Sequence, residues 1–462
     1  MSATTNLTQG PIRSQLIALA VPMLAGNILQ QLYNTIDAVI VGMYVGDAAF
    51  AAVGVSASVM DLFLFLISGG CAGVGILLSQ HHGAGDGRTF RRNFYLSALF
   101  GGLLVIGLTL VAMAVLSPLL TALQTPADII GYVNEYLHII FLGFLAAFAY
   151  HLGSAVLRAV GNTSAALFFL MISLVVNLVL AVVFIAKLDM GVRGAALATV
   201  IAQGVAAILC LLYLGVRFPE LMFHRADMVY DGSLLRRIAH FSLVSALQSC
   251  NLYIGKLLVQ GTVNRLGTAS ITAFTAATRI EGFANSFGDS GASAVSIFVG
   301  QNTGANNQQR VQEGFRKGEK LLAVFALFMT AVMIFGAAPC LNLVLPEDSA
   351  DSLAPALGYF RLVACFYLFN FLGSGLSGYF RGRGLINIPV IGSTGHITLR
   401  VILSFFLAPH FGLPAVALAT GLGWMGVVTF WTILLRREQK AAAEGKPFSL
   451  FPSKQLQHTN RH

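Results

Sequence analysis

The sequence predicts an all-α membrane protein in which twelve transmembrane helices form two pseudo-symmetric six-helix lobes around a central cleft. Three observations lead to this prediction: the composition, the recurrence of apolar segments and an internal repeat. Of the 462 residues, 56% are hydrophobic and only 10% are charged. Soluble globular domains carry about 25% charged residues, so this composition indicates a chain that crosses a membrane many times.

Apolar segments long enough to cross a hydrocarbon core of about 30 Å recur along the whole chain, with no room between them for a soluble domain. The first segment follows no basic stretch and no small-residue cleavage site, so we expect an uncleaved first helix. We place the twelve segments at residues 14–41, 50–80, 91–116, 128–158, 164–186, 193–216, 235–263, 269–301, 312–338, 351–380, 387–408 and 414–436.

The loops between these segments differ in charge according to the side of the membrane on which they lie. Of the 28 Lys and Arg residues, 21 lie on the side of the N-terminus, and only Lys187, Arg193 and Arg265 lie on the other. Because loops rich in Lys and Arg stay in the cytoplasm, we expect both termini to be cytoplasmic and the number of spans to be even. The net charge of +9 therefore reflects topology in a bacterial or archaeal cell (inner) membrane, and no nucleic-acid partner is expected.

The two halves of the chain match each other at an offset of 221 residues. Gln80-x-x-Gly83-Ala84 recurs as Gln301-x-x-Gly304-Ala305, for example. Each half holds six predicted helices, an even number, so both run in the same direction through the membrane. The predicted domains are an N-lobe at 1–220, a cytoplasmic inter-lobe loop at 221–234, a C-lobe at 235–440 and a cytoplasmic tail at 441–462.

The first predicted helix carries a polar stripe. Asn27, Gln30, Asn34 and Asp37 lie three or four residues apart, so they share one face of a helix. A carboxylate inside a span costs a few kcal/mol or more, so this face should point into the bundle or a wet cavity and mark an ion or substrate path. The alternative role of Asp37 is a structural hydrogen bond.

Three further carboxylates, Asp61, Glu281 and Asp289, fall well inside predicted spans. Asp61 aligns with Glu281 across the repeat to within one residue, which predicts one acidic residue in each lobe beside a shared cleft. Lys256 either joins this cleft or simply neutralises Glu281. The residues predicted for the substrate cleft are Glu281, Asp61, Asn285, Lys256 and Gln30.

Several motifs together resemble the multidrug and toxic compound extrusion (MATE) family, over nearly the whole chain. They are the twofold six-helix repeat, the paired Gln-x-x-Gly-Ala loops, Arg279-Ile280-Glu281, and Leu32-Tyr33-Asn34-x-x-Asp37-x-x-x-Val41-Gly42 in the first helix. The prokaryotic branch driven by protons or sodium is the most similar.

The resemblance implies a cation site in the N-lobe, formed by Asp37, Asn177 and Thr199, with Tyr33 and Asn34 beside it in the family motif. Asn177 and Thr199 have an alternative role in helix packing, which is common for such residues in membranes. Ala181 stands where family members often carry a second Asp or Asn, and the loss of this oxygen ligand favours the proton over Na⁺. The resemblance also suggests that the first helix bends on protonation, and Pro22 would supply the hinge because it removes a backbone hydrogen bond.

We therefore expect a secondary antiporter that exports amphipathic, mostly cationic organic compounds in exchange for protons or Na⁺. Its partners would be these small molecules and the bilayer, and we expect it to be monomeric, with no cofactor beyond the coupling cation. One alternative is a flippase for a lipid-linked or amphipathic lipid intermediate, which should carry more basic residues in the cleft. An enzyme is not expected, because no H-E-x-x-H motif or nucleophile–base pattern occurs.

The remaining motifs predict no further chemistry. The five cysteines are dispersed and indicate neither a disulfide framework nor a metal site. The Gly-rich loops at 81–92 and 302–316 fit no phosphate-binding spacing, so we interpret them as basic turns at the lipid headgroups, and ATP is not expected to drive transport.

Overall fold

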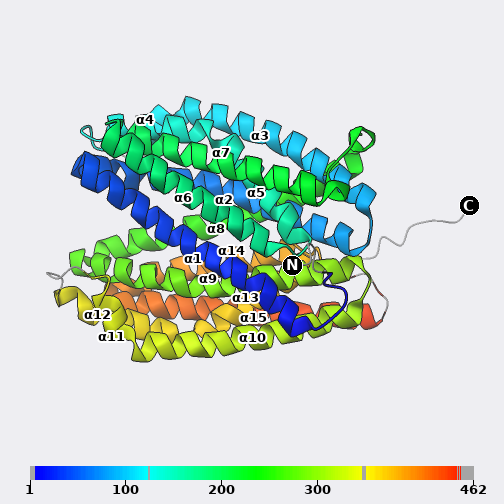
Figure 1. Cartoon of the computed structure of the whole chain (residues 1–462). Helices are drawn as coiled ribbons and strands as arrows, with labels where there is room; N and C mark the ends of the chain where they lie inside the picture. The colour runs from blue at the N-terminus through cyan, green and yellow to red at the C-terminus, as the bar shows by residue number, and fades with distance from the viewer. Residues whose placement is uncertain (1–5, 123–124, 346–349, 445, 447, 449–462) are drawn as a thin grey trace, which may run out of the picture.

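The computed structural model describes residues 6–122, 125–345, 350–444, 446 and 448, with the side chains of residues 33–38, 122, 350 and 443 outside the description. In these ranges every regular element is helical (Figure 1). The longer helices are α1 (Ile12–Val45), α2 (Asp47–Gly83), α3 (Gly87–Ala122), α4 (Ile130–Leu142), α5 (Phe144–Ala159), α6 (Thr163–Val182), α7 (Gly191–Arg217), α8 (Gly232–Val263), α9 (Thr268–Gly304), α10 (Gln308–Phe335), α11 (Ala337–Asn342), α12 (Ala350–Ala364), α13 (Tyr367–Gly382), α14 (Asn387–Phe411) and α15 (Leu413–Ala443). Short helical turns are η1 (Val183–Lys187), η2 (Pro219–Leu221), η3 (Arg225–Asp227) and η4 (Asn264–Leu266).

Most of these helices can cross a bilayer. Among the described residues, eight are long and apolar enough, and up to ten spans result when the bent pairs α4–α5 and α12–α13 each count as one. The two pairs bend by 47° and 50°. Helices α8 and α9 have 32 and 37 residues, and at about 1.5 Å per residue they are also long enough to cross, but they are more polar. Each predicted span coincides with a helix or a bent pair, and the all-helical membrane fold is confirmed.

The backbone repeats with the sequence. Helices α2 and α9 begin at Asp47 and Thr268 and end at Gly83 and Gly304, both 221 residues apart. The turns match as well, because left-handed backbone conformations recur at equivalent places, as in Gly46 and Gly267 with φ of 108° and 93°. Other such pairs are Gly85 with Asn306, Gly161 with Gly384, and Gly191 with Gly412. A left-handed φ favours glycine or asparagine, which explains why these residues recur in both halves.

Three clusters of buried apolar side chains form the core. The largest lies mainly within α2–α7 and includes Ile40 and Val41 near the end of α1, and a second lies within α8–α15. The first turns of α1 leave the first lobe and join a third cluster with α9, α10, α13 and α15, while Ile238 and Phe241 of α8 pack into the first cluster. Figure 1 shows α1 crossing obliquely from the side of α10 to the side of α6. The predicted division of the chain at 221–234 stays a prediction, and residues 232–234 of this range belong to α8. In space, the first turns of α1 and α8 each pack with the other half of the chain.

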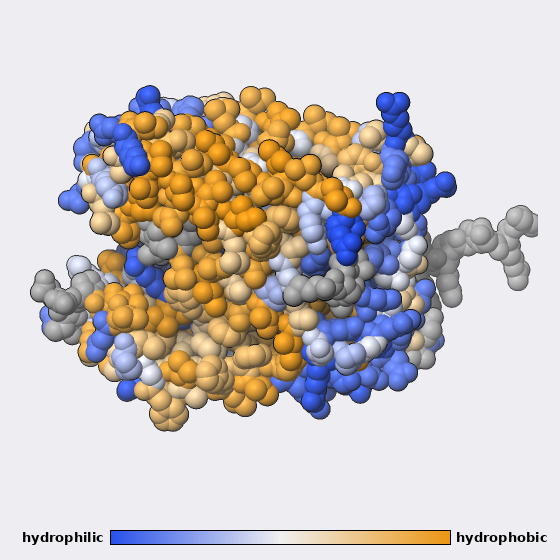
Figure 2. All heavy atoms as spheres, in the orientation of Figure 1, coloured by the Kyte–Doolittle hydropathy of each residue, from blue (hydrophilic) through white to orange (hydrophobic). Residues whose placement is uncertain are grey.

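The surface supports a membrane location. Figure 2 shows an apolar band across the middle of the molecule, with polar residues gathered toward its two ends. At the left end of this view, where α1 finishes, a hollow separates the two lobes. The lobes are in contact elsewhere, so the molecule is open between its lobes at one end.

Candidate functional site

The lobes are joined at the end opposite the hollow by two equivalent glutamines. Gln80 Nε2 donates to the carbonyl oxygen of Gly382 over 2.9 Å, and Gln301 Nε2 donates to that of Ala159 over 2.7 Å. Each bond links one lobe to the other. Gln80 and Gln301 are related by the repeat, so the same hydrogen bond is made twice.

Two glycines allow this close approach. A Cβ atom on Gly83 would collide with the backbone carbonyl of Gln301, and one on Gly304 would collide with that of Gln80. The Gln-x-x-Gly spacing therefore gives each lobe a side-chain hydrogen-bond donor and, one turn later, a glycine whose missing side chain lets the other lobe approach. In the sequence this motif marks the repeat, and its place at the junction of the lobes was not predicted.

The N-terminal segment covers the same end. The backbone N–H of Leu7 donates to Gln301 Oε1 over 3.3 Å, and the Leu7 carbonyl accepts from Asn302 Nδ2 at 3.2 Å and from Arg310 Nε at 2.8 Å. Leu7 itself is fully buried. The predicted loop at 302–316 thus contributes Arg310 to a contact within the protein as well as basic charge at the membrane surface.

The polar stripe of α1 meets α9 midway along the helices. Asn27 Nδ2 donates to Ser290 Oγ over 3.1 Å, and Gln31 Nε2 donates to Ser286 Oγ over 2.7 Å. Gln30 lies exposed on α1. The first part of the stripe therefore lies along a seam between the lobes. Gln31 lies on this seam too, although it was not among the residues predicted for the site.

The side chains of Tyr33, Asn34 and Asp37 lie outside the described residues, so their assignment to a cation site stays a prediction. Their backbone belongs to α1, which packs against α6 and α7. The structure shows no break in α1 at Pro22, and the predicted hinge there stays a prediction.

Two of the predicted cation ligands in the N-lobe do meet. Asn177 Nδ2 donates to Thr199 Oγ1 over 3.1 Å, and Thr199 Oγ1 lies 3.1 Å from the carbonyl oxygen of Ala195. Both side chains are buried. Ala181, one turn beyond Asn177, is fully buried and supplies no ligand. The Asn177 and Thr199 side chains are neutral, so neither supplies a positive charge to a neighbouring carboxylate.

Glu281 is buried in α9, and its assignment to the substrate cleft stays a prediction. Its side chain is buried, 6% exposed, and Oε1 has no hydrogen-bond partner among the described residues. Arg400 of α14 and Tyr359 of α12 are its electrostatic neighbours within the C-lobe. Asn285, one turn further, accepts from Asn370 Nδ2 at 2.9 Å. Glu281 and Asn285 thus face other helices of the C-lobe, which pack around α9.

Lys256 lies between the lobes near three carboxylates. It is exposed on α8 and is an electrostatic neighbour of Asp61 on α2, of Glu281 and of Asp289. One turn away, the Tyr253 hydroxyl donates to the Ser58 carbonyl over 2.9 Å and fixes α8 against α2. Asp289 is exposed on α9 and also has Arg381 as an electrostatic neighbour, and a carboxylate exposed inside a span indicates a wet cavity. Asp289 was predicted inside a span but not among the cleft residues.

No group of three or more His, Cys, Asp or Glu side chains suited to a metal occurs in the described part of the chain. The candidate site therefore consists of a lobe seam joined at one end, a neutral polar pair in the N-lobe and a charged cluster around Lys256.

Known proteins share this organisation. A family model described as MatE matches residues 22–183 and again residues 245–406, one match in each half. The probable multidrug resistance protein YpnP of Bacillus subtilis is 29% identical over 424 residues, which cover 91% of this chain and 94% of that protein. The probable multidrug resistance protein NorM of Thermotoga maritima is 24% identical over 429 residues, covering 90% and 89%.

The fold is shared with a solved structure described as an outward-facing conformation of a multidrug resistance MATE family transporter. That structure has a TM-score of 0.89 and 21% sequence identity, and the match covers 97% of this chain and 99% of the other. The resemblance expected from the sequence is confirmed, and so is the repeat, because one family model matches both halves.

Proposed function

Since this chain belongs to the MatE family of multidrug transporters, we propose that it exports amphipathic, mostly cationic organic compounds by antiport with protons. The observation that carries the proposal is the lobe seam, which is joined at the end of Gln80 and Gln301 and open at the other. Apart from the bond between Tyr253 and Ser58, which lies nearer the open end, the described hydrogen bonds between the lobes lie from the middle of the helices to the joined end. Rocking the lobes would break few bonds and expose the cleft to the other side, as alternating access requires.

The coupling cation is best placed in the N-lobe, because the two lobes differ at equivalent positions. In the C-lobe, Arg400 stands opposite Asn177 in the repeat and supplies Glu281 with a fixed positive charge. In the N-lobe, Asn177 and Thr199 are neutral. If Asp37 of α1 lies beside them, as the resemblance implies, its carboxylate would need an exchangeable cation to balance its charge. Sodium prefers several oxygen ligands, and Ala181 removes one, so the proton is the favoured ion and Na⁺ the alternative.

The charges around Lys256 support a preference for cationic substrates. Three carboxylates share this lysine as an electrostatic neighbour; Glu281 also has Arg400 nearby and Asp289 also has Arg381, so Asp61 depends on Lys256 most. A cationic compound that enters the cleft would replace Lys256 as the partner of Asp61 and Asp289. The flippase alternative would require basic residues to hold a pyrophosphate, and the charge around Lys256 favours the antiporter.

The orientation follows from the distribution of charge. With the Lys- and Arg-rich loops in the cytoplasm, the joined end of the seam faces the cytoplasm and the hollow faces outward. The described state is then open to the outside of the cell membrane, and the protein acts as a monomer.

The test is transport by the purified protein in proteoliposomes loaded with a fluorescent cationic dye. We expect dye movement under an imposed pH gradient and little under an imposed Na⁺ gradient of equal size. Dye movement driven only by the Na⁺ gradient would show that Na⁺, and not the proton, is the coupling ion. No movement under either gradient, with a lipid-linked substrate moved instead, would replace the antiporter with the flippase.

A further inference from the structure

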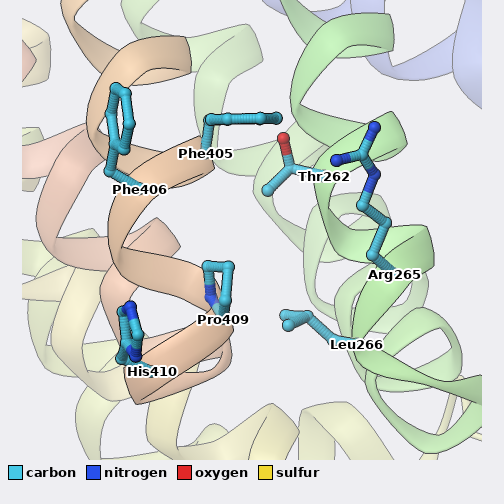
Figure 3. A pocket seen from close by; sticks show the side chains of 7 residues that line it. All are labelled: Thr262, Arg265, Leu266, Phe405, Phe406, Pro409 and His410. Atoms are coloured by element: carbon cyan, nitrogen blue, oxygen red, sulfur yellow. The ribbon is translucent and has the colours of Figure 1, made fainter.

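A pocket of about 290 Å³ lies at the outer edge of the C-lobe, away from the seam residues described above. It is formed by the last turn of α8, the following turn η4 and the last turns of α14. Figure 3 shows side chains of α14 on one wall and those of α8 and η4 on the other. The lining residues are Thr262, Arg265, Leu266, Phe405, Phe406, Pro409 and His410.

Arg265 brings a positive charge to this pocket without a carboxylate to balance it. None of the ion pairs or hydrogen bonds found among the described residues includes Arg265. Its guanidinium carbon lies 5.4 Å from the centre of the Phe405 ring, a cation–π distance. This contact holds the side chain in place and leaves its N–H groups available for an acceptor.

The apolar part of the pocket faces outward from the protein. Phe406 is 66% exposed, Phe405 is 47% exposed and the adjacent Phe411 is 68% exposed. Three exposed phenylalanines close together near the end of a transmembrane helix form an apolar patch of the kind that contacts lipid. The pocket therefore presents an apolar wall toward lipid and a cation at headgroup depth.

The repeat provides an internal comparison. In the N-lobe, the positions equivalent to Arg265, Phe405 and His410 are Tyr44, Phe184 and Asp189. Phe405 keeps an aromatic equivalent, whereas Phe406 is replaced by Ile185, Arg265 by Tyr44 and His410 by the acid Asp189. The feature is thus specific to the C-lobe and is not required by the fold.

We propose that this pocket binds one anionic phospholipid of the outer leaflet. Arg265 would bind the phosphate, with two N–H donors suited to two phosphate oxygens, and the phenylalanines would contact the upper acyl chain. Pockets for whole drug-sized molecules begin at about 300 Å³, so the volume fits one segment of an amphiphile better than a complete transport substrate. The site links lipid composition to α8 and α14, which carry Lys256 and Arg400.

The test counts lipids retained by the detergent-purified full-length protein in native mass spectrometry, titrated with phosphatidylglycerol or with phosphatidylcholine. We expect the wild type to hold one phosphatidylglycerol more tightly than phosphatidylcholine, and Arg265→Gln to weaken that binding about tenfold, as expected for the loss of a charged hydrogen-bond donor. The matched control is Arg193→Gln. Arg193 lies on the same predicted side but is paired with Glu135 at 2.6 Å, so the variant should keep the lipid.

Further measurements check that each variant folds and that the acyl chain contributes to binding. Arg265→Lys retains the charge and should bind phosphatidylglycerol with intermediate affinity, and thermal unfolding confirms that each variant is folded. Equal binding of both lipids, or unchanged binding in Arg265→Gln, would overturn the proposal. Glycerol phosphate that binds as tightly as phosphatidylglycerol would show an anion site with no role for the acyl chain, and would also overturn it.

Discussion

Gln301 of one lobe donates a hydrogen bond to the Ala159 carbonyl of the other at 2.7 Å, at the place where the repeat sets Gln80 against Gly382. Both bonds must break when the lobes separate at this end. They are formed by flexible side chains with backbone acceptors, so each stabilises the closed end by about 1 kcal/mol. The closed end is thus held by a contact that is specific but weak enough to open during transport.

The first prediction concerns this contact. Gln301→Ala should raise the population open at this end about fivefold, because about 1 kcal/mol is removed from one of two competing states. The measurement is the distance across the hollow at the opposite end, between spin labels at positions 132 and 343, in a background lacking the five native cysteines; this distance should shorten as the joined end opens. Gln309→Ala is the control, since Gln309 is exposed and bonds to Glu313 within α10. An unchanged distance distribution in Gln301→Ala would show that the glutamine does not hold the end closed.

The second prediction concerns the glycines beside the glutamines. Gly83→Ala should prevent full closure of the cytoplasmic end, because the added methyl group would collide with the Gln301 carbonyl. Transport should fall more than tenfold while the protein remains in the membrane. Gly107→Ala is the control, since no atom lies within 4 Å of a Cβ at that helical position. If the two alanine variants transported dye equally well, close approach at Gly83 would be unnecessary.

The third prediction separates coupling from packing. Thr199→Val removes the hydroxyl that accepts from Asn177, and should reduce efflux driven by a pH gradient about tenfold with dye binding unchanged. Thr420 is its equivalent in the C-lobe, buried and bonded to the Val416 carbonyl at 2.8 Å. Thr420→Val is therefore the same chemical change in the other lobe, and it should keep efflux. Equal losses in both variants would indicate a packing role for both threonines.

The fourth prediction concerns substrate charge. Lys256→Met should tighten binding of a cationic dye about fivefold, because it removes a competing cation from Asp61 and Asp289. Asp61→Asn should weaken it by a similar factor. Binding of a neutral dye of similar shape should change in neither variant. The measurement is fluorescence polarisation in detergent, and parallel changes for neutral and cationic dyes would show that charge does not select the substrate.

The fifth prediction concerns stability in the loop between α7 and α8. Arg91 Nε donates to the buried carboxylate of Asp227 over 2.7 Å and holds the pKa of that carboxyl below its usual range. A carboxyl with a lowered pKa contributes stability above its unfolded pKa of about 3.9, and this contribution is lost as the pH falls through the folded value. Asp227→Asn should lower the melting temperature by a few degrees at pH 7, and the difference should shrink toward pH 3. A constant difference across this range would exclude the ion pair as the cause.

Much of the fold could be predicted because it depends on local patterns. Span length and hydropathy located the helices, and the recurring Gly46 and Gly267 marked equivalent turns. The exchange of α1 and α8 between lobes could not be predicted, because apolar residues such as Leu16 and Phe241 fit either core equally well. Their partners are set by tertiary packing, which the helical period does not encode.

The site was predicted in part for a similar reason. Asn177 and Thr199 lie on adjacent helices and meet as the resemblance implied. Glu281 was expected at the cleft because Asp61 aligns with it across the repeat, to within one residue. Which face meets the cleft depends on the neighbouring helices, and the structure buries Glu281 near Arg400 while exposing Asp289.

The most direct measurement is uptake of a cationic dye against its own gradient in proteoliposomes under an imposed pH gradient, comparing the wild type with Asp37→Asn at matched protein content. If Asp37 carries the exchanged proton, Asp37→Asn should fold and bind the dye but lose accumulation, because it mimics the protonated state permanently. Asp37→Glu should retain part of it. An Asp37→Asn protein that still accumulates dye against its gradient would contradict proton coupling at this residue and direct attention to Glu281.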